Sequence, residues 1–131
     1  MAWVEVFVVF VVCHLVGDYL LQTDWQATHK RGGLGPDPRS RRALASHILS
    51  YTLAYVPAFI WLAGDLGGAK LAAVVALVAV PHWIQDDGRL LTVYIRKVKG
   101  PQAAQNKTVA ATADQSFHTV ALLLVSFLAG G

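Results

Sequence analysis

Residues 3–21 read WVEVFVVFVVCHLVGDYLL, and this apolar run decides the fold class. Its core, Val4–Val16, is rich in β-branched and aromatic residues that would favour a strand in water. The run is long enough to cross a hydrocarbon core, which takes about 20 residues of helix. Because backbone polar groups in lipid must be satisfied within the segment, the stretch predicts a membrane-spanning helix.

Three further apolar blocks repeat this pattern, so the sequence predicts a single all-α integral membrane domain covering residues 1–131. Four transmembrane helices form a bundle of two helical hairpins, with spans at about 3–21, 43–63, 69–94 and 108–128. The segment Gln22–Arg42 holds several glycines and prolines and predicts a loop. Composition agrees, since charged residues make up 15% of the chain and soluble domains carry about a quarter.

The positive charges set the expected topology. Lys and Arg gather after the first and third predicted spans, and short basic loops stay in the cytoplasm. Both termini should therefore lie outside, with the chain crossing the lipid bilayer as a multi-pass protein. The same placement argues against nucleic acid as a partner, although the formal charge is +3. The single cysteine, Cys13, excludes an internal disulfide and a multi-cysteine zinc motif.

Alanines in the third span are spaced for close helix contact. The pairs Ala69/Ala73 and Ala72/Ala76 have the small-xxx-small spacing of membrane helix interfaces. A homo-oligomer is one way to use that spacing. General richness in alanine explains the pattern equally well.

Histidines and aspartates recur inside these spans at one helical spacing. Three His–Asp pairs stand four residues apart, which places each pair on one helix face, and a fourth histidine stands on the second span. They lie at a similar depth from the expected cytoplasmic side. Asp87 points away from the face of His82, so Asp86 is the expected partner. The seven candidate metal-binding residues are His14, Asp18, His47, His82, Asp86, Asp114 and His118.

A charged side chain in the bilayer costs about 2.5–3.5 kcal/mol on insertion scales, so these residues must face inward and be neutralised. A divalent metal, with zinc or manganese favoured, would do this, because imidazole and carboxylate are common ligands for such ions. Seven ligands exceed the need of one tetrahedral ion, which leaves open a two-metal site or a supporting role for some aspartates. A metal-free hydrogen-bond network between the helices is the structural alternative.

Several motifs resemble one protein family. The opening stretch His14-Leu-Val-Gly-Asp18-Tyr-Leu-Leu-Gln22-Thr-Asp24-Trp25 and the stretch Asp114-Gln-Ser-Phe-His118 resemble signatures of the bacterial membrane proteins known as domain of unknown function 3307. His47 and the His82/Asp86 pair match the family's remaining positions, although Gln85-Asp86-Asp87-Gly88 departs from the expected Ile-Asp. The resemblance implies a membrane protein of the bacterial inner (cytoplasmic) membrane and implies no named reaction.

Metal-assisted hydrolysis of a lipid-like or membrane-associated substrate is the function that the pattern favours, with an aspartate as general base. The first alternative is a transport module that handles protons or other ions, since His–Asp relays carry protons in membranes. The second is a non-catalytic membrane scaffold that uses the His/Asp network for folding. Whether the protein is an enzyme at all stays open at this point.

Overall fold

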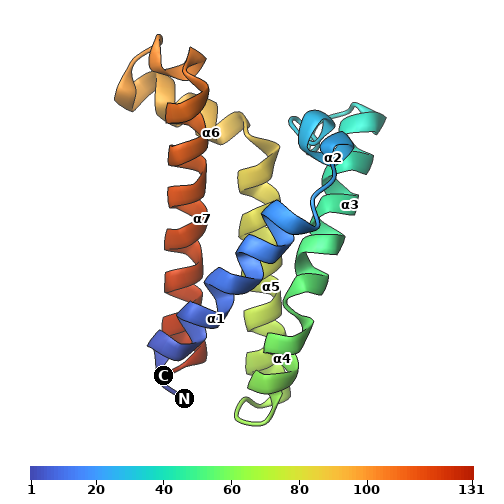
Figure 1. The fold of residues 1–131 in the computed structure, drawn as a ribbon, viewed down its shortest axis with the longest axis vertical. Coiled ribbons are helices and arrows are strands. Elements are labelled where there is room, and N and C mark those ends of the chain that lie inside the picture. The colour runs from blue at the N-terminus through green and yellow to red at the C-terminus, as the bar shows by residue number, and fades with distance from the viewer.

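The computed structural model describes residues 1–131 and is entirely helical, with no strand. Four long rods make up the fold: α1 with η1, α3 with α4, α5, and α7. The last three stand side by side, and α1 with η1 runs obliquely across them (Figure 1). The short elements α2, α6, η2 and η3 sit at one end of them. In chain order the elements are α1 (Trp3–Leu15), η1 (Val16–Leu20), α2 (Asp24–His29), α3 (Pro38–Ala54), α4 (Val56–Ala63), α5 (Gly68–Asp87), α6 (Arg89–Tyr94), η2 (Ile95–Lys99), η3 (Ala103–Gln105) and α7 (Lys107–Ala129).

The two basic segments, Gln22–Arg42 and Arg96–Lys107, lie at the same end of the molecule (Figure 1). Both termini lie at the other end with the turn between α4 and α5. Lys70, at the start of α5, donates to the backbone carbonyl of Gly131 at 3.3 Å. The alternation of helix direction expected from the sequence is therefore present.

Local chemistry sets where the helices begin and end, and the structure differs from the sequence-based expectation in three places. The Gln22–Arg42 segment contains α2, whose N-terminus is closed by a reciprocal capping box between Thr23 and Gln26. Helix α3 starts at Pro38 because Asp37 caps it and proline suits the first turn. The third helix stops at Asp87, since Gly88 adopts the left-handed conformation (φ 76°) that closes helices.

The second rod is bent rather than straight. Its two pieces, α3 and α4, meet at an angle of 46°. Pro57, at the start of α4, has no N–H to donate and its ring crowds the carbonyl of Leu53, so a regular helix cannot continue through this point. The bend falls beyond the polar cluster, among apolar residues.

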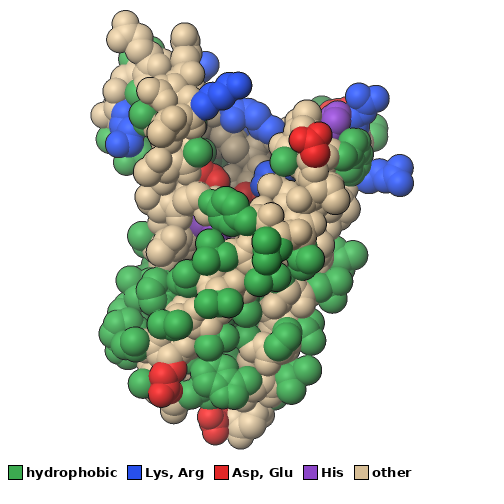
Figure 2. Space-filling model, viewed as in Figure 1, with side chains coloured by type: hydrophobic (Ala, Val, Ile, Leu, Met, Phe, Trp, Pro, Cys, Tyr) green, Lys and Arg blue, Asp and Glu red, His purple; other side chains and the backbone are tan.

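The apolar end of the bundle holds the hydrophobic core, built from residues such as Phe10, Tyr55, Leu62 and Val74. Apolar side chains also cover its outer surface (Figure 2). Leu49, Ile60 and Leu124 are 62–71% exposed, for example. So large an exposed apolar surface is typical of a protein that meets lipid or another protein.

Two helical segments, Trp3–Leu20 and Gly68–Asp87, are long and apolar enough to cross a membrane, and the bent α3–α4 pair makes a third if it counts as one span. Helix α7 has 23 residues but does not join this set, because its N-terminal half is polar. Membrane association is thus supported by two or three segments.

Candidate metal centre

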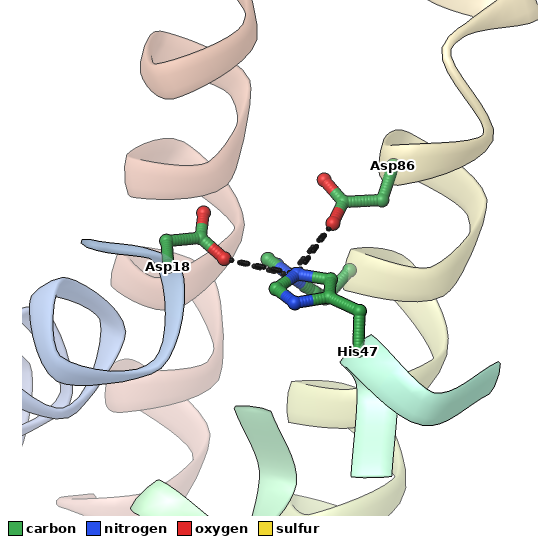
Figure 3. Close-up of side chains that lie close together, drawn as sticks. Asp18, His47 and Asp86 are labelled. Carbon is green, nitrogen blue, oxygen red and sulfur yellow. Dashed lines mark hydrogen bonds and ion pairs between the residues drawn. The ribbon is translucent and has the colours of Figure 1, made fainter. Parts of the chain in front are cut away.

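Four side chains from three rods converge at the polar end of the bundle. Asp18 comes from η1, His47 from α3, and His82 and Asp86 from α5 (Figure 3 shows three of them). Nε2 of His47 lies 3.2 Å from Oδ1 of Asp18 and 2.8 Å from Oδ2 of Asp86. Nε2 of His82 lies 3.2 Å from each of the same two oxygens. The two nitrogens are themselves 3.2 Å apart. Two imidazole nitrogens and two carboxylate oxygens therefore surround one point.

The other oxygen of Asp86 faces a second group. Its Oδ1 lies 3.2 Å from Nε2 of His118, and Asp114 stands one turn before that histidine on α7. One donor atom from each of Asp86, Asp114 and His118 lies within 4.8 Å of the others. Asp86 thus belongs to both groups, one oxygen to each.

The tautomer of His118 indicates that a proton or a metal ion lies between this ring and Asp86. Nδ1 of His118 donates to the backbone carbonyl of Asp114 at 2.7 Å. In a neutral ring Nε2 then carries a lone pair, and it makes no hydrogen bond although it is buried. A lone pair and a carboxylate oxygen repel each other at 3.2 Å unless a proton or a metal ion lies between them. Oδ1 of Asp18 is likewise buried without a hydrogen-bond partner.

His14 is close to this cluster but uses both ring nitrogens elsewhere. Nε2 donates to the side-chain oxygen of Gln115 at 2.8 Å, and Nδ1 accepts from the Tyr51 hydroxyl at 3.1 Å. Tyr51 accepts in turn from Tyr55 at 2.7 Å, and its ring stacks on His82 with centroids 3.5 Å apart. His14 and Tyr51 therefore fix the orientation of His82 and tie α1, α3 and α7 together.

The approach of η1 to α3 depends on a glycine. A Cβ on Gly17 would lie 2.6 Å from Cδ2 of Tyr51 and 3.3 Å from its Cα. The five residues of η1 form one turn of π-helix, an irregularity that recurs at functional sites. Gly17 and this turn together bring Asp18 to His47 and His82.

Lys30 is a residue of this site that the sequence did not single out. It follows α2, and its ammonium group donates to Oδ2 of Asp86 at 2.7 Å and to the side-chain oxygen of Gln22 at 2.6 Å. From the sequence it is one of several cations in a basic segment. The capping-box pattern at Thr23 and Gln26 could have indicated that a short helix starts in this segment. It does not indicate that the segment folds back over the cluster.

The neighbouring aspartate has a different role. Asp87 accepts from the backbone N–H of Leu34 at 2.8 Å and from Nε of Arg89 at 2.6 Å. Its backbone carbonyl accepts from the N–H of Gly32 at 2.9 Å. Asp87 thus fastens the basic segment to the end of α5, while Asp86 faces the histidines.

All seven residues named from the sequence lie in one interior. Six are buried, with exposed fractions of 0–7%, and Asp114 is half-buried. Six of the seven offer donor atoms to one or other group, and His14 borders them, 3.7 Å from Oδ2 of Asp18. Whether these residues bind metal stays a prediction.

The resemblance seen in the motifs extends over nearly the whole chain. The family described as "Protein of unknown function (DUF3307)" matches residues 6–130. The chain belongs to this family. No curated protein and no solved structure matches it. Every residue of the His/Asp cluster lies within the part of the chain that DUF3307 covers.

Proposed function

We propose that the protein is an integral membrane metalloprotein that holds a divalent ion between Asp18, His47, His82 and Asp86. The observation that carries this proposal is the convergence of four donor atoms on one point. Five of the distances between these donor atoms, given above, run from 2.8 to 3.2 Å. In a tetrahedral zinc site with bonds of about 2.0–2.1 Å, geometry places the donors about 3.3 Å apart. The cluster is therefore close to ligand spacing.

Charge supports a divalent ion. Asp18, Asp86 and Asp114 carry three negative charges when ionised, and Lys30 supplies one positive charge. Two negative charges remain if the histidines are neutral, which is the form that ligates metals. An ion of charge +2 offsets them inside the bundle. Zinc suits the two-nitrogen, two-oxygen set, and manganese is the alternative.

His118 and Asp114 extend the centre. A second ion would share Asp86 with the first, since that carboxylate presents one oxygen to each group. With a single ion, a proton on Nε2 of His118 would instead lie between that nitrogen and Oδ1 of Asp86. The metal-to-protein ratio distinguishes the two arrangements.

We place the site within four membrane-spanning segments: α1 with η1, α3 with α4, α5, and α7. The exposed apolar surface supports this placement, and the polar half of α7 then faces the site rather than lipid. With the basic end in the cytoplasm, both termini lie outside a bacterial inner membrane.

Hydrolysis of a lipid-like or membrane-associated substrate is the chemistry that fits best. A divalent ion lowers the pKa of water bound to it. Asp114 is outside the four-donor group, is half-buried and lines an adjoining cavity, so it is the carboxylate placed to accept a proton. Lys30 would hold Asp86 in position through its 2.7 Å contact.

Elemental analysis of the detergent-purified chain tests the metal site. Wild type and the control His29→Ala, which changes a histidine outside the cluster, should retain the ion. Asp18→Asn, which keeps the size of the side chain, and His47→Ala should lose most of it. A chelator should lower the thermal midpoint of wild type and of His29→Ala, because an ion that binds the folded state stabilises it by linkage. It should leave the thermal midpoints of Asp18→Asn and His47→Ala unchanged. Equal melting with and without chelator, and no metal in wild type, would refute the proposal.

A proton-handling role is the second candidate. The hydrogen-bonded series Tyr55–Tyr51–His14–Gln115 runs from the apolar core to the cluster and favours it. In that case the protein would contain no metal, and proton flux into vesicles would depend on His14.

A further inference from the structure

A cavity opens beside the metal centre at the basic end of the molecule. It measures about 260 Å³ and is lined by the side chains of Lys30, Arg31, Asp86 and Asp114, among others. Figure 2 shows Lys and Arg side chains around a hollow at this end, with acidic side chains deeper inside. The cavity thus reaches two residues of the cluster from a rim of positive charge.

Its cations are placed to receive a ligand. Lys30 holds Asp86 from one side, so its ammonium group stands at the edge of the cluster. Arg31 is exposed and is anchored by a hydrogen bond from one guanidinium nitrogen to the Thr92 hydroxyl on α6. Its other N–H groups stay free for an anion. Arg89, by contrast, is engaged by Asp87 and does not line the cavity.

The charge inside the cavity becomes positive when the metal is present. Lys30 and Arg31 offset two of the three carboxylates Asp18, Asp86 and Asp114, and an ion of charge +2 then leaves a net charge of +1. Phosphate is the anion that matches such a site, because arginine, lysine and a divalent ion all bind its oxygens.

A second cavity continues from the first and is mainly apolar. It measures about 220 Å³ and shares Gln85, Leu91 and Asp114 with the basic cavity. Its remaining walls are Ile84, Leu90, Tyr94 and Phe117. A third cavity of about 440 Å³ shares Tyr94 and Phe117 and follows the side of α7. A polar pocket that leads into an apolar groove is complementary to an amphiphile, which has a polar head and an apolar tail.

We propose that this site binds a phosphate-bearing lipid, with the phosphate between Lys30, Arg31 and the ion and the acyl chain along Leu91 and Phe117. The proposal rests on the metal centre proposed above and names the ligand class of that centre. The apolar groove favours a lipid headgroup over a free phosphate ion.

Calorimetric titration of the full chain in detergent, with its bound metal, tests this site. The probes are dihexanoyl phosphatidic acid, dihexanoyl phosphatidylcholine and inorganic phosphate. Phosphatidic acid should bind most tightly, because its phosphate is exposed and its chains are apolar. Phosphatidylcholine has the same chains, but its phosphate is masked by choline and it should bind weakly.

Variants separate the headgroup from the tail. Arg31→Gln should weaken phosphatidic acid binding about tenfold or more, the effect of one hydrogen bond to a charged group, while keeping the metal. Lys97→Gln, an exposed cation outside the cavities, is the matched control and should bind normally. Phe117→Ala should weaken phosphatidic acid binding and leave inorganic phosphate unchanged.

The outcomes discriminate cleanly. Equal affinity for phosphatidic acid and inorganic phosphate would overturn the lipid ligand, and no saturable binding of either to metal-loaded protein would overturn the phosphate site. Elemental analysis is read on the same samples. Arg31-dependent binding in protein from which the metal has been removed would refute the part assigned to the ion in ligand binding and would support the basic cavity on its own.

Discussion

At the scale of single residues, the candidate centre depends on side chains that are far apart in the sequence but hold one another in a fixed orientation. Tyr51 is the central one, because its ring stacks on His82 and its hydroxyl lies between His14 and Tyr55. His14 is oriented by that hydroxyl and by Gln115. His14 and His82 therefore have little freedom to turn away from the cluster.

Gly17 is the most sensitive position in this arrangement. In Gly17→Ala the new methyl group would overlap the Tyr51 ring, whose stacking and hydrogen bonds oppose movement. We expect the free energy of unfolding to fall by about 1–3 kcal/mol, the usual cost of overpacking, and metal affinity to fall with it. Denaturant titration and metal competition measure both. Gly68→Ala, where a Cβ meets nothing within 4 Å, is the control and should lose neither. A fully stable Gly17→Ala protein with normal metal affinity would show that the contact is not tight.

At the scale of elements, short devices decide where helices stop and how segments return to the site. Gly88 ends α5 just after Asp86 and Asp87, and a capping box starts the short helix α2. Lys30, which follows α2, then joins its segment to Asp86. Asp87 then fastens that segment through Leu34. Lys30 and Arg31 reach the cavity because of these contacts.

The cap of α3 gives a pH dependence with a definite sign. Asp37 accepts from the hydroxyl of Ser40 at 2.6 Å and from its backbone N–H at 2.9 Å, and these bonds hold the pKa of Asp37 below its ordinary value. Its contribution to stability is thus present above the pKa of the unfolded chain, about 4, and is lost as the pH falls through the folded pKa. The thermal midpoint of wild type should exceed that of Asp37→Asn at neutral pH, and the gap should close below about pH 4.

Asp65→Asn is the control for this experiment. Asp65 lies in the turn between α4 and α5 and caps no helix, so the substitution should leave no gap that closes with acid. A gap between wild type and Asp37→Asn that stays constant from neutral to acid pH would contradict the role of the ionised cap.

At the scale of the whole molecule, one end is apolar on the outside and the other is basic and hollowed (Figure 2). The polar cluster lies between the basic end and the apolar core. In the proposed membrane placement, a ligand with a charged head and an apolar tail would reach the cluster from the membrane surface without crossing the bilayer. Ala72 and Ala76 of α5 are exposed, and a homo-oligomer on that face stays a prediction.

Cysteine labelling tests the orientation of the whole molecule. On a Cys13→Ala background, Pro36→Cys and Val98→Cys should be protected from an impermeant reagent in intact cells, because both lie in basic segments expected in the cytoplasm. Asp65→Cys, at the opposite end, should react. Labelling of Pro36→Cys from outside would contradict the predicted topology and indicate the reverse orientation.

The sequence by itself determined that the chain is all-helical and which helix faces turn inward. Apolar runs such as residues 3–21 have no stable alternative to helix in lipid, and a spacing of four residues places His82 and Asp86 on one face. The same local rules indicated Asp86 rather than Asp87. These features could be predicted because they depend on residues close together in the chain.

Only the tertiary structure decided which atoms meet. The hydrogen bond between Lys30 and Asp86 joins residues 56 positions apart in the chain. It depends on how the segment with α2 folds back, and no periodic pattern in the sequence predicts such a contact. His14 has the same spacing to Asp18 as His82 has to Asp86, yet it bonds Gln115 and Tyr51 instead. Helical periodicity sets the direction of a side chain, whereas the rotation and separation of the helices, limited here by Gly17 against Tyr51, set its partner.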